Sequence, residues 1–482
     1  MTVYICIARF LLTSWVGLLA WLGLSLLLQA PATAARDLTL IQCIDLAVKN
    51  DPQTQNARQK VEIAKLKRDK AIQDFYPKLD VYVTRGPQTD YFGQPVTQNN
   101  IYYTGVGIEQ PLYKGGNLTN GVKLAESETS RQEQEYLFRK LAVAAEAVKA
   151  YYEAMTEQAK IQQFEALLRY GQEDLREAQA RLAAGRGTRL DVLDLSVKLL
   201  EVQQRLSKAR ADFQVKLSAL NRLVGFEEGT SLSLVRQFPL VDIQGDESAL
   251  LSEAQARRPD LKASHEDVNY NQLKTQIEDG KRWPQLSFVA RHEWESPTFF
   301  SGKKDWMIML KASVSLGNST LSYSEQRNEL YPNPYAFPQP PGFPNATYVF
   351  PVRQLRYSLF DRSSNKVELE EARAARDLSQ NRWAQMRLQV NLDVKDAYSQ
   401  KADSSARMVT AQQQITMARE LVGINQIKYG SGMTTLAEVF KARATLAEAE
   451  VNLATAQNDR ATALGKLYQA VGRDMVFKEK GP

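Results

Sequence analysis

The segment from Asn117 to Val224 constrains the fold most, because it reads as one very long amphipathic helix, a glycine break and a second helix running back. Its apolar residues recur at alternating spacings of four and three, which keeps one apolar seam facing a partner, as in a coiled coil. The first helix, from about Leu118 to Ala184, would extend roughly 100 Å at 1.5 Å per residue. A rod of that length does not fit inside a compact domain, so we expect the reach itself to serve the function.

The same plan occurs twice in the chain. A shift of 247 residues overlays the two copies without a gap, and the matched pairs include Leu112 and Leu359, Tyr151 and Tyr398, Gly185 and Gly432, and Leu206 and Leu453. Further upstream the shift is 207, which places Pro52 on Pro259 and Pro77 on Pro284. The second copy therefore carries 40 more residues, the difference between the two shifts, all between Pro284 and Leu359. Constant offsets of this kind indicate an internal duplication.

The chain divides into five parts. Residues 1–34 have the pattern of a secretory signal peptide, although the apolar run is also long enough for an uncleaved membrane anchor. The predicted parts that follow are a first repeat over 37–225, a linker over 226–247, a second repeat over 248–472 and a tail over 473–482. The formal net charge of +6 is mild and spread along the chain, which does not indicate a nucleic-acid partner.

Cys43 is the one cysteine that remains after the signal, so the mature chain has no internal disulfide. The preceding Gln42 is large for the position before a lipidated cysteine, and Cys43 lies within an amphipathic segment. We expect a buried cysteine, while lipidation stays open as the alternative.

Segments of alternating apolar and polar residues predict four strands, two in each repeat. The first repeat offers 79–84 and Ile101–Leu112. The second offers Gln285–Trp294 and either Trp306–Leu316 or 352–360, of which we favour the former because 11 residues suit a tilted strand that spans a bilayer. The proline-rich segment 317–351 between these two candidates is expected to be irregular, either outside the cell or at the junction of sheet and helices.

Four strands cannot close a barrel, and an open sheet edge in lipid leaves backbone groups unpaired at a cost of several kcal/mol each. No segment after the signal reads as an apolar membrane-spanning helix. The chain must therefore oligomerise if its strands meet lipid, and three copies would supply twelve strands. Each long helix would be covered by its return helix and a shorter helix stacked end to end. Four columns per chain would then give a twelve-column tube.

The chain resembles the TolC family of outer-membrane efflux proteins over essentially all of residues 37–475. The resemblance is carried by the order of several weak motifs, which are Leu38-Thr39-Leu40, Ala47 to Pro52, Pro111 to Gly116, Gly187 to Leu193, and Arg258-Pro259-Asp260-Leu261. It implies a mainly α fold with long antiparallel hairpins in an α-barrel, four membrane strands per chain, and a homotrimer with a twelve-stranded β-barrel. It also implies an exit duct in the outer membrane and periplasm, docked to a periplasmic adaptor and an inner-membrane pump or ABC transporter for efflux or type I secretion.

The resemblance places the periplasmic mouth at the two helix turns. The implied tip and adaptor-docking residues are Gly185, Gly187, Thr188, Leu190, Gly430, Gly432 and Thr434. The implied constriction residues are Asp191, Asp194, Tyr429, Glu438 and Lys441. Lys441 stands where the family pattern has an aspartate and Thr434 where it has an arginine. The three acids also fit solvated positions at helix N-termini, where the helix dipole favours negative charge.

Other functions fit less well. The two histidines, His265 and His292, have no ligand or triad spacing, and the sequence has no phosphate-loop or zinc motif, so we expect no enzyme, cofactor or metal. A periplasmic adaptor also uses helical hairpins, and an adaptor-like coiled-coil protein without a pore is the alternative. An adaptor carries one hairpin within β-rich domains, whereas this chain carries two hairpins and few strands.

Overall fold

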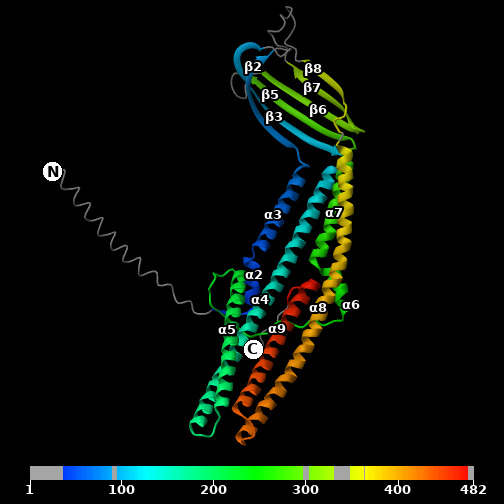
Figure 1. The fold of residues 1–482 in the computed structure, drawn as a ribbon. Coiled ribbons are helices and arrows are strands. Elements are labelled where there is room, and N and C mark those ends of the chain that lie inside the picture. Colours follow the sequence, from blue (N-terminus) through cyan, green and yellow to red (C-terminus); the bar gives the residue numbers. More distant parts are fainter. Residues whose placement is uncertain (1–35, 90–94, 297–302, 331–347, 363, 476–482) are drawn as a thin grey trace, which may run out of the picture.

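The computed structural model describes residues 36–89, 95–296, 303–330, 348–362 and 364–475. The molecule is elongated, with a curved sheet at one end and a bundle of long helices that ends in two hairpin tips at the other (Figure 1). The duplication is visible in the helix bounds. The helices are α2 (Leu40–Asn50), α3 (Pro52–Gln73), α4 (Asn117–Ala183) and α5 (Arg189–Val224), then α6 (Glu247–Arg257), α7 (Pro259–Gly280), α8 (Asn365–Gly430) and α9 (Leu436–Val471).

The second half follows the first closely. Adding 207 to the bounds of α2 and α3 gives those of α6 and α7, and adding 247 to the bounds of α5 gives those of α9. Helices α4 and α8, of 67 and 66 residues, agree at the same shift to within one residue. The predicted long helix, glycine break and return helix are therefore confirmed in both halves.

Local sequence explains where the helices begin and end. The Asp51 side chain caps α3, and Pro52 follows at the first helical position, where its missing N–H is not needed. Both return helices end at a glycine in the left-handed region, Gly225 with φ of 81° and Gly472 with φ of 77°. This conformation suits glycine because a Cβ would be strained there.

The helices form parallel columns around α4. Helix α3 covers its upper part and α5 its lower part, which is the predicted end-to-end stacking (Figure 1). Helices α7 and α9 repeat this arrangement along α8, and both also pack against α4. One inner column, α4, thereby joins the two halves.

The main apolar core lies halfway along the rod. There α2, α6 and the parallel pair β1 (Arg36–Leu38) and β4 (Leu232–Leu234) surround the long helices. The linker between the halves is held down by buried tyrosines: the Tyr151 hydroxyl donates to the Val235 carbonyl at 2.6 Å, and the Tyr468 hydroxyl to that of Val241 at 3.1 Å. Cys43 is buried in this core, as predicted, and burial raises the pKa of its thiol to about 12.

The described part of the sheet has six strands, so the prediction of four strands per chain is wrong. Their spatial order is β2-β3-β5-β6-β7-β8 and every neighbouring pair is antiparallel. The strands are β2 (Lys78–Thr89), β3 (Pro95–Lys114), β5 (Gln285–Ser296), β6 (Lys303–Leu316), β7 (Ser319–Leu330) and β8 (Tyr348–Ser358). Both candidates for the fourth strand, 306–316 and 352–360, lie in the sheet, as β6 and most of β8.

The missed strand is β7, which lies in the segment expected to be irregular. The prolines that suggested a loop begin only at Pro332, beyond the end of β7, and residues 331–347 lie outside the described part of the chain. Pro351 lies within β8, opposite Arg327 of β7, so this one proline did not prevent a strand. Composition averaged over the whole segment therefore hid a regular hairpin.

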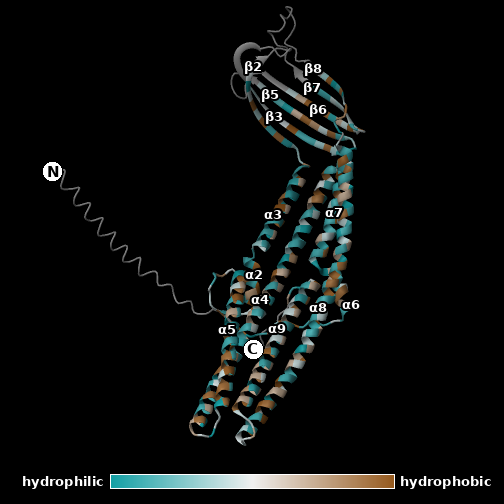
Figure 2. Cartoon of the chain, viewed as in Figure 1, coloured by the Kyte–Doolittle hydropathy of each residue, from teal (hydrophilic) through white to brown (hydrophobic). Residues whose placement is uncertain are grey.

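Hydrophobic and hydrophilic residues alternate along several strands of the sheet (Figure 2), and the strand register shows that the two faces differ in polarity. One face carries apolar residues such as Val81, Phe288 and Leu310. On the other face, the Tyr82 hydroxyl donates to the Glu293 carboxylate at 2.5 Å. Gly105 lies between these two residues, and a Cβ there would come within 2.5 Å of the Tyr82 ring. Within the described residues, no helix is both long enough and apolar enough to cross a bilayer.

Candidate functional site

The two hairpin tips share one construction. At the end of α4 the Arg186 N–H donates to the Arg181 carbonyl at 2.9 Å, and at the end of α8 the Met433 N–H donates to the Lys428 carbonyl at 2.8 Å. Each turn has a glycine one position earlier that hydrogen-bonds three residues back, at 3.1 Å for Gly185 and 3.0 Å for Gly432. This is the Schellman motif, which needs a left-handed residue after the helix.

The predicted glycines have different roles within these turns. Gly185 and Gly432 have φ of 72° and 70°, with nothing within 4 Å of an added Cβ, so backbone conformation alone requires glycine. Gly187 instead approaches the Leu182 backbone, where a Cβ would lie 3.1 Å from the nitrogen. Gly430 has open space around it.

The return helices start with threonine caps. The Thr188 hydroxyl accepts from the Asp191 N–H at 3.1 Å, and the Asp191 carboxylate accepts from the Thr188 hydroxyl at 2.7 Å. Asp191 is therefore a capping residue, which is the structural alternative considered for it. In the second tip, Thr435 caps α9 by accepting from the Glu438 N–H at 3.4 Å. The equivalent of Thr188 is thus Thr435, whereas Thr434 is half-buried beside it.

Apolar side chains point into solvent at both tips. Leu190, in the first turn of α5, is 74% exposed, and Met433, between Gly432 and Thr434, is 75% exposed. Apolar residues also follow α5 toward its tip in Figure 2. Tight backbone turns thus present apolar groups at the ends of the molecule.

Tyr429 joins the second tip to the first hairpin. Its hydroxyl donates to the Glu177 carboxylate of α4 at 2.7 Å, and the Arg181 guanidinium lies 4.6 Å from its ring centre. Arg181 also pairs with Glu177 at 2.8 Å. Burial, together with the Glu177 carboxylate, raises the pKa of Tyr429. These three residues fix the end of α8 against the end of α4.

A second polar link lies a little further from the tips. Arg443 of α9 donates to both oxygens of the Asp174 carboxylate at 2.8 Å and lies 5.3 Å from the ring centre of Tyr170. Burial raises the pKa of Asp174 even though Arg443 opposes this shift. Next to this pair, Gly171 leaves room for Phe440, since a Cβ there would lie 2.5 Å from that ring.

The structure does not bring the other predicted constriction residues together within one chain. Asp194 pairs with Lys198 on its own helix at 2.9 Å. Glu438 is exposed in the first turn of α9, and Lys441 lines a pocket of about 140 Å³ where α4, α5 and α9 meet, together with Lys198 and Glu201. The partners of Tyr429 and Arg443 were missed by sequence reasoning. The spacing of Asp174, Glu177 and Arg181, which places them on one helix face, was the available signal.

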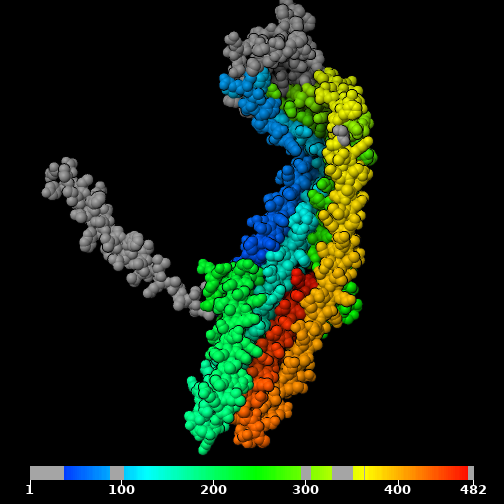
Figure 3. Space-filling model, in the orientation of Figure 1, coloured from blue at the N-terminus to red at the C-terminus, as the bar shows by residue number. Residues whose placement is uncertain are grey.

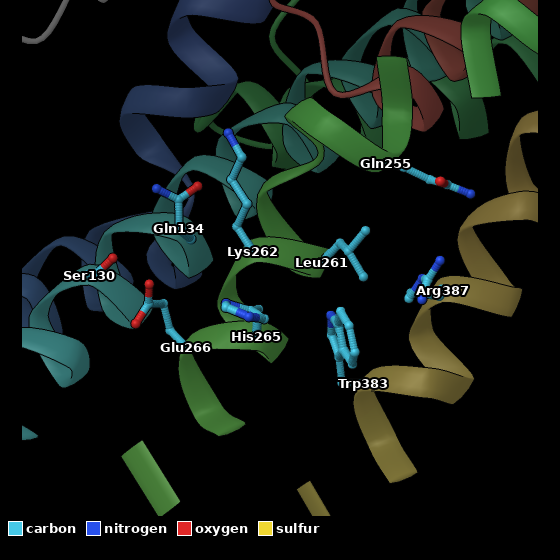
Figure 4. Close-up of a pocket in the computed structure, with 9 residues that line it drawn as sticks. All are labelled: Ser130, Gln134, Gln255, Leu261, Lys262, His265, Glu266, Trp383 and Arg387. Atoms are coloured by element: carbon cyan, nitrogen blue, oxygen red, sulfur yellow. The ribbon is translucent and has the colours of Figure 1, made fainter. Parts of the chain in front are cut away.

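A larger pocket of about 510 Å³ lies higher, where α4, α6, α7 and α8 meet (Figure 4). His265 packs edge-on against Trp383 with ring centres 5.5 Å apart, and Arg387 lies over the same indole. His292 is in the sheet beside Trp294 and so lies far from His265. In the described ranges, no three His, Cys, Asp or Glu side chains gather as metal ligands.

A sheet with one largely apolar face on four helical columns that end in matched tips defines a class of protein, in which a membrane-type β-sheet continues into a long helical bundle. The model of the outer membrane efflux protein family matches residues 43–226 and 345–473. The chain belongs to this family.

Individual relatives are more distant. AprF, the alkaline protease secretion protein of Pseudomonas aeruginosa, is 24% identical over 194 residues, which are 40% of each chain. The outer membrane efflux protein BepC of Brucella suis is 26% identical over 267 residues, 53% of this chain and 55% of BepC. The chain thus spans about half the length of these curated relatives. The Campylobacter jejuni CmeC outer membrane channel has the same fold, with a TM-score of 0.70 at 14% identity over 92% of this chain and 87% of CmeC.

Proposed function

We propose that three copies of this chain form an outer-membrane channel that continues through the periplasm as a helical tunnel. The channel is the exit duct of a tripartite efflux pump or a type I secretion system, and it performs transport rather than catalysis. The observation that carries this proposal is the described sheet, which is open at β2 and β8 and apolar on one face. Such a sheet is stable in lipid only when other copies close it.

The helical columns support the same assembly. Within one chain, α9 lies between α4 and α8, whereas α5 lies on the outside of the bundle (Figure 3). Several apolar residues remain exposed along α5 and α8, among them Leu193, Leu200, Leu421 and Ile424. A second copy would cover them and continue the alternation of inner and return helices around a tube.

The tips provide a docking site for a partner. We propose that a periplasmic adaptor, which links the duct to an inner-membrane pump or ABC transporter, contacts Leu190 and Met433 and the turns that present them. Gly185, Gly187, Thr188, Gly430, Gly432 and Thr434 shape these turns. Exposed apolar groups on rigid turns are typical of a surface that a protein partner buries.

The links from Tyr429 to Glu177 and from Arg443 to Asp174 close the mouth in this proposal. They hold the ends of α8 and α9 against α4, so that opening the mouth requires breaking them. Asp191, Asp194, Glu438 and Lys441 complete a ring of charged groups only in the trimer. Two of these four side chains, Asp191 and Asp194, already bind Thr188 and Lys198 of their own hairpin. The tyrosine and arginine links therefore contribute more to closure than this ring does.

Reconstitution of the purified protein in liposomes tests the channel. We expect discrete, long-lived conductance steps, and their absence from preparations that contain folded protein would contradict the proposal. Replacing Gly185–Asp191 or Gly432–Glu438 by a glycine-serine sequence separates the docking role. Trimers and conductance should persist, while export in the native host, measured as dye efflux and secreted protein, should be lost. Export that survives both replacements would refute docking at the tips.

A further inference from the structure

The second half of the chain has four described strands where the first half has two. Strand β5 starts 207 residues after β2, the same shift that relates α3 to α7. Strand β8 aligns with β3 at the shift of 247, the same as for α5 and α9. Strands β6 and β7 therefore form an inserted hairpin between two strands that are equivalent to β2 and β3. The 40 extra residues are those needed for this hairpin and its connections.

The inserted hairpin is part of the sheet rather than an appendage to it. Strand β6 pairs with β5 from Gln285 to Glu295, and β7 pairs with β8 from Thr320 to Leu330. Part of the apolar face continues across it, from Phe288 of β5 to Leu310 of β6 and from Val314 of β6 to the paired residues Leu321 and Tyr357 of β7 and β8. Further along β7 and β8 the same face carries Glu325, Arg327 and Arg353, of which Arg353 pairs with Glu325 at 3.7 Å. The unbroken strand pairing from β5 to β8, rather than the polarity of this face, therefore places the hairpin in the sheet.

We propose that the trimer closes its membrane wall with eighteen strands, six from each chain, and that β8 of one chain pairs with β2 of the partner subunit. This inference rests on the proposed trimeric channel. An even number of strands leaves β8 antiparallel to the next β2, as closure by antiparallel pairing requires. At a spacing of ~4.8 Å and a tilt of ~40°, eighteen strands enclose a barrel about 36 Å across the backbone, against about 24 Å for twelve.

The duplication also predicts the register of this seam. Within the chain, β3 and β5 join the first half to the second, with Gln110 opposite Phe288 and Ile108 opposite Ala290. Adding 247 to the residue numbers of β3 and subtracting 207 from those of β5 gives the residue pairs expected between β8 of one chain and β2 of the partner subunit. Tyr357 then lies opposite Val81 of the partner subunit, and Leu355 opposite Val83 of the partner subunit. Both pairs place apolar side chains on the apolar face.

A twelve-stranded wall makes a different prediction. If β6 and β7 lay outside the wall, β5 and β8 would be neighbours and would repeat the register of β2 and β3. Leu79 faces Ile108 in that first pair, so Leu286 would face Leu355. In the six-stranded sheet, Leu286 instead faces Ala312.

Three cysteine pairs in the full-length protein distinguish the two walls. Each is made in a cysteine-free background (Cys6→Ala, Cys43→Ala) and oxidised in membranes, with the single-cysteine proteins as matched controls. The pairs are Val81→Cys with Tyr357→Cys, Leu286→Cys with Ala312→Cys, and Leu286→Cys with Leu355→Cys. Facing residues of antiparallel strands lie within the Cα separation that a disulfide tolerates.

The eighteen-stranded wall predicts covalent dimers and trimers from the first pair, an internal disulfide from the second and none from the third. An internal disulfide from the third pair, with none from the second, would overturn the inference and leave the channel intact. If the first pair does not link chains in a protein that still conducts, the proposed pairing of β8 with β2 of the partner subunit is wrong. Loss of conductance in the cysteine-free parent, together with a monomeric state, would instead count against the proposed function.

Discussion

The return helices α5 and α9 have equal lengths of 36 residues, matching threonine caps and matching glycine ends, yet they are buried very differently. Nineteen residues of α9 are buried, compared with nine of α5. Helix α9 packs against both α8 and α4, whereas α5 packs mainly against α4. Helix α9 has ten alanines and α5 has three, and small side chains suit a helix that packs on two sides, so both composition and position in the chain account for the difference. One of the two return helices lacks a neighbour.

In the proposed trimer, the duplication makes α8 of another copy the expected neighbour. Within the chain, Phe440 of α9 packs against Gly171 of α4. The shift of 247 relates Phe440 to Leu193 of α5, and Gly171 to Ala418 of α8. Leu193 is 53% exposed in the single chain, whereas Phe440 is only 2% exposed. In the proposed trimer, Leu193 of one copy is therefore expected beside Ala418 of another, with leucine in place of Phe440 and alanine in place of Gly171. Ala418 is already only 4% exposed within its own chain, so this contact would mainly cover Leu193.

Truncating these two equivalent residues tests the comparison with the largest expected effect. Phe440→Ala removes a buried ring and should lower the free energy of unfolding by about 3–5 kcal/mol. Leu193→Ala should leave chain folding nearly unchanged and lower the trimer fraction. Far-UV circular dichroism in guanidinium measures the first effect, and native gels measure the second. If Leu193→Ala unfolds the chain as much as Phe440→Ala without affecting trimers, the equivalence is wrong.

The next test gives the contact within the chain, Gly171 with Phe440, the residue types of the contact expected between chains. Gly171→Ala places a methyl group within 2.6 Å of both Phe440 and Leu199, and should cost about 1–3 kcal/mol of unfolding free energy. Adding Phe440→Leu should restore much of that loss, because this pair then copies Ala418 and Leu193. A double-mutant cycle measures the coupling between the two changes. Simple additivity would show that the two sites do not share this contact.

A third comparison concerns the residue that precedes α3 and α7, which is acidic in the first half (Asp51) and basic in the second (Arg258). Asp51 pairs with Arg139 at 3.0 Å, whereas the equivalent Arg258 pairs with Asp260 at 2.9 Å and with Asp393. Burial opposes ionisation of Asp51, but hydrogen bonds from Arg139 and Thr54 outweigh it and lower its pKa below 3.8. Asp51 therefore stabilises the fold above pH 3.8, and this contribution is lost as the pH falls through its folded pKa.

Asp51→Asn should accordingly lower stability by about 1–2 kcal/mol at pH 7, because a cap and a charged partner are both weakened. The deficit should shrink toward pH 2, where the native aspartate is protonated as well. Melting curves of the variant and the parent across this range measure it. A deficit that is independent of pH would contradict the role of the charge.

The smallest effect on stability is expected at the tip. Tyr429→Phe removes one hydrogen bond to Glu177, worth about 0.5–1.5 kcal/mol, and should open the mouth rather than unfold the chain. Conductance in planar bilayers should rise while the melting temperature stays nearly constant. The first half has Leu182 where the second has Tyr429, so Leu182→Ala is the matched control and should leave conductance unchanged. Equal conductance of Tyr429→Phe and the parent would show that the hydrogen bond from Tyr429 to Glu177 does not keep the mouth closed.

The sequence predicted the helices well because their signals are local. Spacings of four and three, prolines such as Pro52, and glycines such as Gly185 and Gly432 act within a few residues, and they fixed helix bounds in both halves. Strand β7 was missed because its polar residues give no clear alternation and because nearby prolines dominated the segment. Its pairing is with β6 and β8, which is tertiary information.

At the tips, sequence located the turns but not the links between them. The turn glycines and Thr188 follow from local backbone chemistry and could be named directly. The partners of Tyr429 and Arg443 lie some 250 residues away on α4, and only the packing of the two hairpins reveals them. Thr434 was named from the family resemblance, whereas the cap of α9 is Thr435, the residue that the shift of 247 already relates to Thr188.

The central claim is that one chain is an incomplete segment of a closed tube. Native mass spectrometry of the protein extracted from membranes in mild detergent tests it most directly. The account predicts a particle with three times the mass of the mature chain, which separates into single chains when the detergent is made denaturing. A stable monomer that needs no detergent to stay in solution would contradict the claim.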